Sequence, residues 1–193
     1  MKKKTYLTGL IFGILWCGVK FISYLLNWDS PETLSTFVML NLLFATFSII
    51  VALLIVNNTR NLDRNLLMDF KTGITSGFIY TLVVSFFIYM YYDKINPDFN
   101  KSRINKRKIE LSKHFDISSK NVEAYRGNNP EWKSLNKKEL LEEDAKATAY
   151  HTSPKITMIF SLSGLLLWTT LNSIVISLIF RRFLFRVRFN SKK

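Results

Sequence analysis

The sequence predicts an all-α membrane protein with four transmembrane helices and a helical extracytoplasmic loop between helices 3 and 4. Four apolar runs support this, because each has about 20 residues or more, the length that crosses the hydrocarbon core of a bilayer. Basic residues gather beside these runs, and one long polar segment separates the last two. We therefore expect three parts: residues 1–93 with helices 1–3, an arm at 94–154, and residues 155–193 with helix 4 and a basic cytoplasmic tail.

The net charge of +13 reflects membrane topology. Lysine and arginine are concentrated in both terminal tails and in the connector between runs two and three, while the connector between runs one and two has neither. By the positive-inside rule, both termini are then expected in the cytoplasm. A nucleic-acid surface would instead gather its basic residues on one face, so we expect membrane lipids, and no nucleic acid, among the partners.

The first run covers residues 6–27 and is predicted to be an uncleaved span. Its apolar stretch is longer than that of a cleaved signal, and no small-residue cleavage site follows it. Gly9 and Gly13 are one helical turn apart, so another helix could approach this side closely. The alternative is that glycine is simply common in membrane helices, and both interpretations remain open.

Lys20 is a charge well inside this run. An ionisable residue within a span is a candidate for function, but a lysine near a helix end can also extend its stem to the headgroups. We favour this second interpretation. The sharper hypothesis is an intramembrane pair between Lys20 and Asp93, which should lie near the same outer boundary.

The third run, residues 72–92, is the candidate centre of the bundle. Helices in lipid associate by close packing, and this run has the longest strip of small side chains at four-residue spacing. The strip consists of Gly73, Gly77, Thr81 and Ser85. The second run, residues 33–56, has a weakly polar face with Asn41 and Ser48. A short interfacial helix is expected between these two runs, from the spacing of Leu62, Leu66, Leu67 and Phe70.

Several short motifs resemble a known family. Gly9 and Gly13, residues 69–73 (DFKTG) before the third span, its aromatic end, and residues 96–99 (NPDF) beyond it are similar to the four-span membrane proteins of Bacteroidota grouped as domain of unknown function 4199. The chain departs from this family in a longer, more basic loop and in an extended basic tail. The resemblance implies an inner-membrane location in a didermal bacterium, and it implies no activity.

The arm is predicted to be a helical hairpin. Ile104, Leu111 and Phe115 have the spacing of an amphipathic helix, and Asn136 with Glu139 forms a capping-box pattern at the start of a second helix. A turn is expected at residues 127–130.

The ionisable residues of the arm do not have the spacing of a reactive site. Glu142, Glu143 and Asp144 are consecutive, so they fan around a helix, and neither His114 nor His151 has a histidine partner four residues away. A solvated helix is the expectation. We therefore predict no catalytic residue, no cofactor and no metal site.

The fourth run covers residues 155–180 and ends at a basic tail. Bulky apolar and basic residues alternate in this tail, a pattern suited to lying on an anionic leaflet. The residues expected to contact anionic lipid are Arg181, Arg182, Arg186 and Arg188.

The sequence favours a non-enzymatic role. Interhelical packing strips and an extramembrane arm, without a catalytic constellation, favour an accessory or scaffold subunit of a cell-envelope complex. Its partners would be other membrane or envelope proteins, or further copies of the chain. The alternative is a small transporter or channel component. In such a protein, several converging polar groups or broken helices would be expected near the bilayer midplane.

Overall fold

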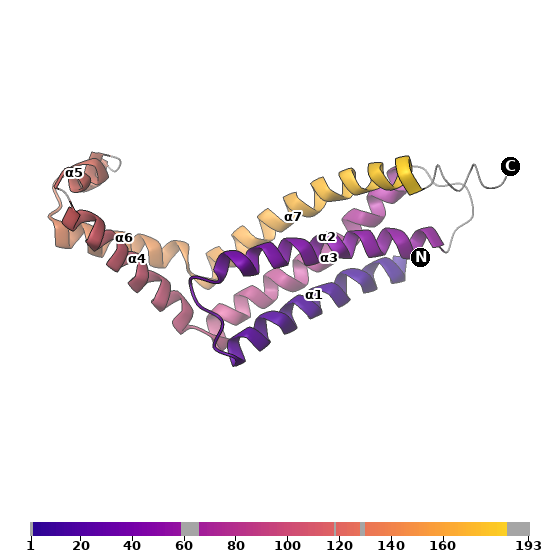
Figure 1. The fold of residues 1–193 in the computed structure, drawn as a ribbon, viewed down its shortest axis with the longest axis horizontal. Coiled ribbons are helices and arrows are strands. Elements are labelled where there is room, and N and C mark those ends of the chain that lie inside the picture. Colours follow the sequence, from indigo (N-terminus) through magenta and orange to yellow (C-terminus); the bar gives the residue numbers. More distant parts are fainter. Residues whose placement is uncertain (1, 59–65, 118, 128–129, 185–193) are drawn as a thin grey trace. The chain divides into compact units, whose positions relative to one another are not determined.

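The computed structural model describes the chain except for residues 1, 59–65, 118, 128–129 and 185–193. The described residues are helical and contain no β-strand, so the prediction of an all-α protein is confirmed. Figure 1 shows the helices α1 (Lys2–Leu25), α2 (Leu34–Asn58), α3 (Leu66–Met90), α4 (Asp98–Ile117), α5 (Ser119–Gly127), α6 (Lys137–His151) and α7 (Pro154–Ile179). Segments of π-helix follow α3 at Tyr91–Ile95 and α7 at Phe180–Leu184, and Pro130–Trp132 is a 3-10 turn.

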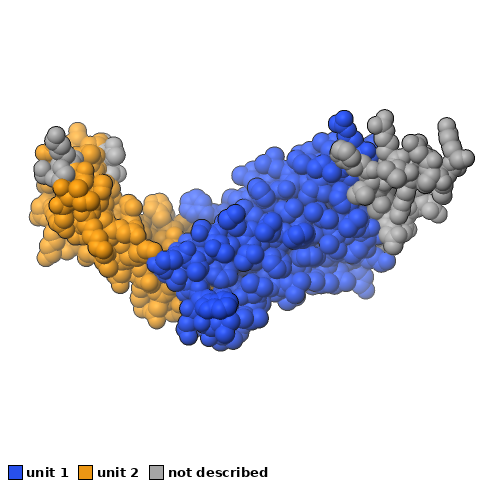
Figure 2. Space-filling model, in the orientation of Figure 1, with its two compact units in different colours: residues 1–88, 158–193 blue, residues 89–157 orange. Residues whose placement is uncertain are grey.

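The chain divides into two compact units, which Figure 2 shows in different colours. The first, which we call the bundle, comprises residues 1–88 and 158–193. The second, which we call the arm, comprises residues 89–157. Each unit has a core of its own and is described separately below.

The four long helices have the length and apolar character of membrane spans. The segments that qualify are Lys3–Leu25, Leu34–Val56, Leu66–Ile95 and Pro154–Arg182. Large apolar side chains such as Leu15, Phe47 and Leu167 are exposed, whereas several hydroxyl side chains are buried between the helices. This distribution suits a lipid solvent, in which helices associate through close packing and hydrogen bonds. The protein is therefore a multi-pass membrane protein.

The third span begins earlier than residue 72, the start predicted from the sequence. α3 starts at Leu66, so Leu66, Leu67 and Phe70 belong to the span and not to a separate interfacial helix. No proline or glycine interrupts residues 66–72, and the helix can therefore continue through them. Leu62, the remaining residue of that prediction, lies outside the described residues.

Two tyrosines at the aromatic end of the third span are buried. Tyr91 and Tyr92 are 1% and 6% exposed, and the ring centroids of Tyr92 and Phe99 lie 5.3 Å apart. The backbone N–H of Asn96 donates to the carbonyl of Tyr91 at 2.8 Å, at the end of the π-helical segment. Tyr91 and Tyr92 are thus buried at the end of the third span.

The arm is built on α4 and α6. Leu111 and Phe115 of α4 form its core with Leu140 of α6, as their helical spacing predicted. The predicted capping box is confirmed, because Glu139 N–H donates to the Asn136 side chain at 2.9 Å and Asn136 N–H donates to Glu139 at 2.7 Å. The short helix α5 was not predicted.

Candidate functional site

Helices α3 and α7 pack closely in the bundle. A Cβ built on Gly73 would lie 2.9 Å from the Cβ of Ser173, and one built on Gly77 would lie 2.6 Å from the Cβ of Thr169. Real Cβ atoms do not approach other atoms this closely. Glycine at these two positions therefore permits the observed separation of the helices.

The other glycine strip brings α1 against α3. A Cβ on Gly9 would meet the carbonyl oxygen of Ser76 and lie 3.0 Å from the Cβ of Ile79. One on Gly13 would lie 3.0 Å from the nearest methyl of Val83. The glycines of the first span thus have a packing role in the structure, which the sequence had left open.

Hydroxyl groups connect α3 to both α1 and α2. The Ser76 oxygen lies 3.0 Å from the Thr8 hydroxyl of α1 and 2.7 Å from the Ser48 hydroxyl of α2. One turn further along α3, the Tyr80 hydroxyl donates to the backbone carbonyl of Asn41 at 2.9 Å. Together with the α3–α7 contacts, these bonds bring α3 into contact with each of the other three spans.

The remainder of the small-residue strip on α3 is buried. Thr81 is 0% exposed and Ser85 is 2% exposed. Neither side-chain oxygen has a hydrogen-bond partner among the described residues. The strip is therefore an interior surface of the bundle along its predicted length.

Lys20 forms a buried ion pair with Asp29, and not with Asp93 as hypothesised from the sequence. The two side chains are 3% and 1% exposed, and the Lys20 ammonium also lies 4.1 Å from the centroid of the Phe37 ring. Asp93 makes an ion pair with Lys94 at 3.2 Å.

The direction in which the Lys20 side chain extends explains why its partner is Asp29 and not Asp93. Lys20 extends toward the connector between α1 and α2, as the headgroup interpretation expected, but it ends on a carboxylate and is not left in solvent. The turn between the two helices brings residues nine positions apart together. The signal in the sequence that could have predicted this pair is Asp29, an acidic residue in the short connector.

A second buried charge organises the arm. Asp144 is 6% exposed, accepts a hydrogen bond from the Tyr125 hydroxyl, and lies 3.5 Å from Arg107 Nε. Burial raises the pKa of Tyr125, and the bond to Asp144 raises it further. Burial lowers the pKa of Arg107, but Asp144 and Tyr125 outweigh this effect and the net shift is upward.

The run of Glu142, Glu143 and Asp144 predicts a solvated helix, but Asp144 is buried. The available signal was its position four residues after Leu140, on the face of α6 that carries the arm's core. In the described part of the chain, no group of three histidine, cysteine, aspartate or glutamate side chains is arranged to hold a metal ion.

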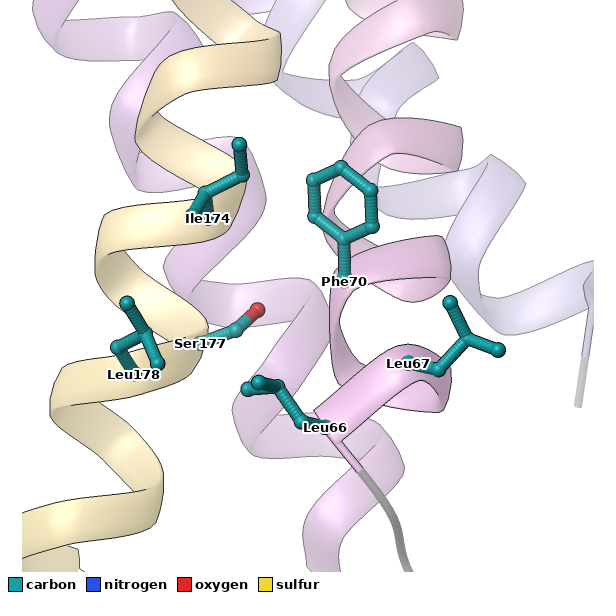
Figure 3. A pocket seen from close by; sticks show the side chains of 6 residues that line it. All are labelled: Leu66, Leu67, Phe70, Ile174, Ser177 and Leu178. Atoms are coloured by element: carbon teal, nitrogen blue, oxygen red, sulfur yellow. The ribbon is translucent and has the colours of Figure 1, made fainter.

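An apolar groove lies between α3 and α7, at the end of the bundle where α3 begins and α7 ends. Its volume is about 380 Å³. Figure 3 shows the residues that line it, which are Leu66, Leu67 and Phe70 from α3 and Ile174, Ser177 and Leu178 from α7. Arg181 and Arg182 lie in the π-helical segment that follows α7 and are exposed. Arg186 and Arg188, also predicted to contact lipid, lie outside the described residues.

The bundle and the arm define a class of protein, a four-span α-helical membrane protein with an extramembrane helical unit between its third and fourth spans. The chain belongs to the family described as "Protein of unknown function (DUF4199)", whose profile matches residues 7–182. This match covers all four spans and the arm. Neither the curated proteins nor the solved structures contain a match to the chain.

Proposed function

We propose that this protein is an accessory or scaffold subunit of a cell-envelope complex in the inner membrane of a Bacteroidota bacterium. The observation that supports this role is the arm, which has its own apolar core and a buried charged network at Asp144. Such an arm presents a preformed surface to a partner. A preformed surface binds without the entropic cost of ordering a disordered segment.

The surface of the arm offers contacts of two kinds. Ile109, Ile117 and Tyr150 expose 55%, 79% and 65% of their surface. Lys108 and Glu110 are exposed on either side of Ile109 in α4. Apolar anchors within a polar surround are the usual composition of a protein interface.

The charge distribution supports an orientation for this role. Lys3 and Lys4 are exposed at the start of α1, and Arg181 and Arg182 are exposed after α7. With these residues in the cytoplasm, the arm faces the periplasm, where it can contact other envelope proteins.

Purification of the full-length protein in a gentle detergent tests the role. We expect wild-type protein to retain a specific partner, or further copies of the chain, and Ile117→Asp to lose it. Ser102→Asp, at another exposed position of α4, is the matched control and should retain the partner. Recovery of a monomer without partners, together with solute flux in liposomes, would overturn the scaffold role. It would favour the alternative, a transporter or channel component.

A further inference from the structure

We propose that the groove between α3 and α7 is a binding site for one anionic phospholipid. In this site an acyl chain fills the groove, a glycerol ester accepts a hydrogen bond from Ser177, and the phosphate contacts Arg181 and Arg182. The site does not depend on the scaffold role, because it belongs to the bundle alone.

The groove has the chemistry that an acyl chain requires. All but one of its lining residues are leucine, isoleucine or phenylalanine. Leu67 and Leu178 are 69% and 50% exposed, so the groove opens at the lipid-facing surface of the bundle. An acyl chain can enter from the surrounding bilayer without crossing the packed interior.

Ser177 is the polar exception, and its position indicates a ligand. Its side chain is 0% exposed, and its hydroxyl has no hydrogen-bond partner among the described residues. Figure 3 shows this hydroxyl directed from α7 toward α3. A buried hydroxyl without a partner is costly, and an ester carbonyl in the groove would remove that cost.

The charge at the end of the groove matches an anionic headgroup. Arg181 and Arg182 come three and four residues after Leu178, in the π-helical segment Phe180–Leu184, and both are exposed. Residues 66–71 and 174–182 contain a single acidic residue, Asp69, and its side chain is only 2% exposed. The exposed charge here is therefore positive.

The order of these groups along α7 and the π-helical segment that follows it matches the order of groups in a phospholipid. Ile174 is apolar, Ser177 is a hydrogen-bond donor, and Arg181 with Arg182 is cationic. In a phospholipid, the acyl chain, the ester and the phosphate follow in the same order toward water. This correspondence favours a lipid over a second protein helix, which would leave the Ser177 hydroxyl against apolar side chains.

Native mass spectrometry of the purified full-length protein tests the site. The probes are phosphatidylglycerol and phosphatidylcholine with identical acyl chains. We expect wild-type protein to retain one phosphatidylglycerol with an affinity on the order of tenfold above that for phosphatidylcholine, since each basic residue near the headgroup adds to binding of an anionic lipid. Equal retention of the two lipids would overturn the proposal.

Three variants with matched controls separate the parts of the site. Arg181→Gln with Arg182→Gln should abolish the preference for phosphatidylglycerol, whereas Lys3→Gln with Lys4→Gln, the same change of charge, should preserve it. Leu178→Trp should reduce retention of both lipids, while Leu171→Trp, two turns earlier on α7 and also exposed, should not.

Ser177→Ala should weaken binding several-fold and preserve the fold. Its control is Ser173→Ala, because the Ser173 hydroxyl already donates to the carbonyl of Thr169 at 2.6 Å. Unchanged lipid binding in both Leu178→Trp and Ser177→Ala would exclude the groove as the site. The groove would also be excluded as a lipid site if its variants changed the fraction of protein dimer and left lipid retention unchanged.

Discussion

Gly77 of α3 lies directly against Thr169 of α7, so closely that a Cβ on Gly77 would come within 2.6 Å of the Thr169 Cβ. Since the atom in the way is attached directly to the α7 backbone, a rotation of the Thr169 side chain could not relieve the clash. The helices would have to move apart, and the buried side chains along the strip would lose contacts.

We expect Gly77→Ala to destabilise the bundle by about 1–3 kcal/mol, the usual cost of overpacking, and Gly77→Leu to prevent assembly. Thermal unfolding in detergent, followed by size-exclusion chromatography, measures the effect. Gly164→Ala on α7 is the control, because nothing lies within 4 Å of a Cβ at Gly164. The Gly77→Ala, Thr169→Gly double variant should be less destabilised than the sum of the single variants. Additive effects would mean that this contact does not limit the approach of the helices.

Replacing one member of the buried ion pair should be costly. Lys20→Met leaves the Asp29 carboxylate buried without its cation, and we expect a loss of stability on the order of 3–5 kcal/mol. The Lys20→Met, Asp29→Asn double variant should recover much of this loss, because no uncompensated charge remains. Asp93→Asn provides the comparison, since the Asp93–Lys94 pair is far more exposed. If Asp93→Asn proved as damaging as Asp29→Asn, Asp29 would not be the principal partner of Lys20.

The bond between Tyr125 and Asp144 should make the stability of the arm depend on pH. We expect Tyr125→Phe to lower it by on the order of 1 kcal/mol at neutral pH. The folded arm raises the pKa of Tyr125 above its ordinary value of 10.0, so the contribution is complete below that pH and disappears as the pH rises through the raised pKa.

Hydrogen exchange of the α6 amides, corrected for intrinsic rates, measures this effect. Protection of wild-type protein and Tyr125→Phe should converge above pH 10, the ordinary pKa of the phenol. Tyr150→Phe should match wild type throughout, because Tyr150 is 65% exposed. A constant difference across this pH range would contradict the assignment.

The orientation in the membrane can be tested by cysteine labelling. In a Cys17→Ser background, Lys113→Cys places a thiol at an exposed position of the arm, and Lys3→Cys places one at the start of α1. With the outer membrane permeabilised, an impermeant maleimide should label the arm position. The α1 position should react only after the inner membrane is opened. The reverse pattern would place the arm in the cytoplasm.

The spans, the two main arm helices and the capping box of α6 could be predicted because they depend on local signals. Length, apolar character and side-chain spacing are properties of a single segment, and hydrogen bonds within the helix satisfy its backbone in lipid. The start of α3 was harder to predict from the sequence, because the polar residues before the span are compatible with both a separate helix and a continuous one.

What the sequence by itself determined was the number of spans and the small-residue faces along them. The tertiary structure decided which face meets which helix, that Lys20 pairs with Asp29, and that Asp144 is buried at the centre of a network. It also decided that Ser177 faces an apolar groove. The physical reason is that periodicity describes one helix at a time, whereas a partner across a helix interface is selected by the packing of whole helices.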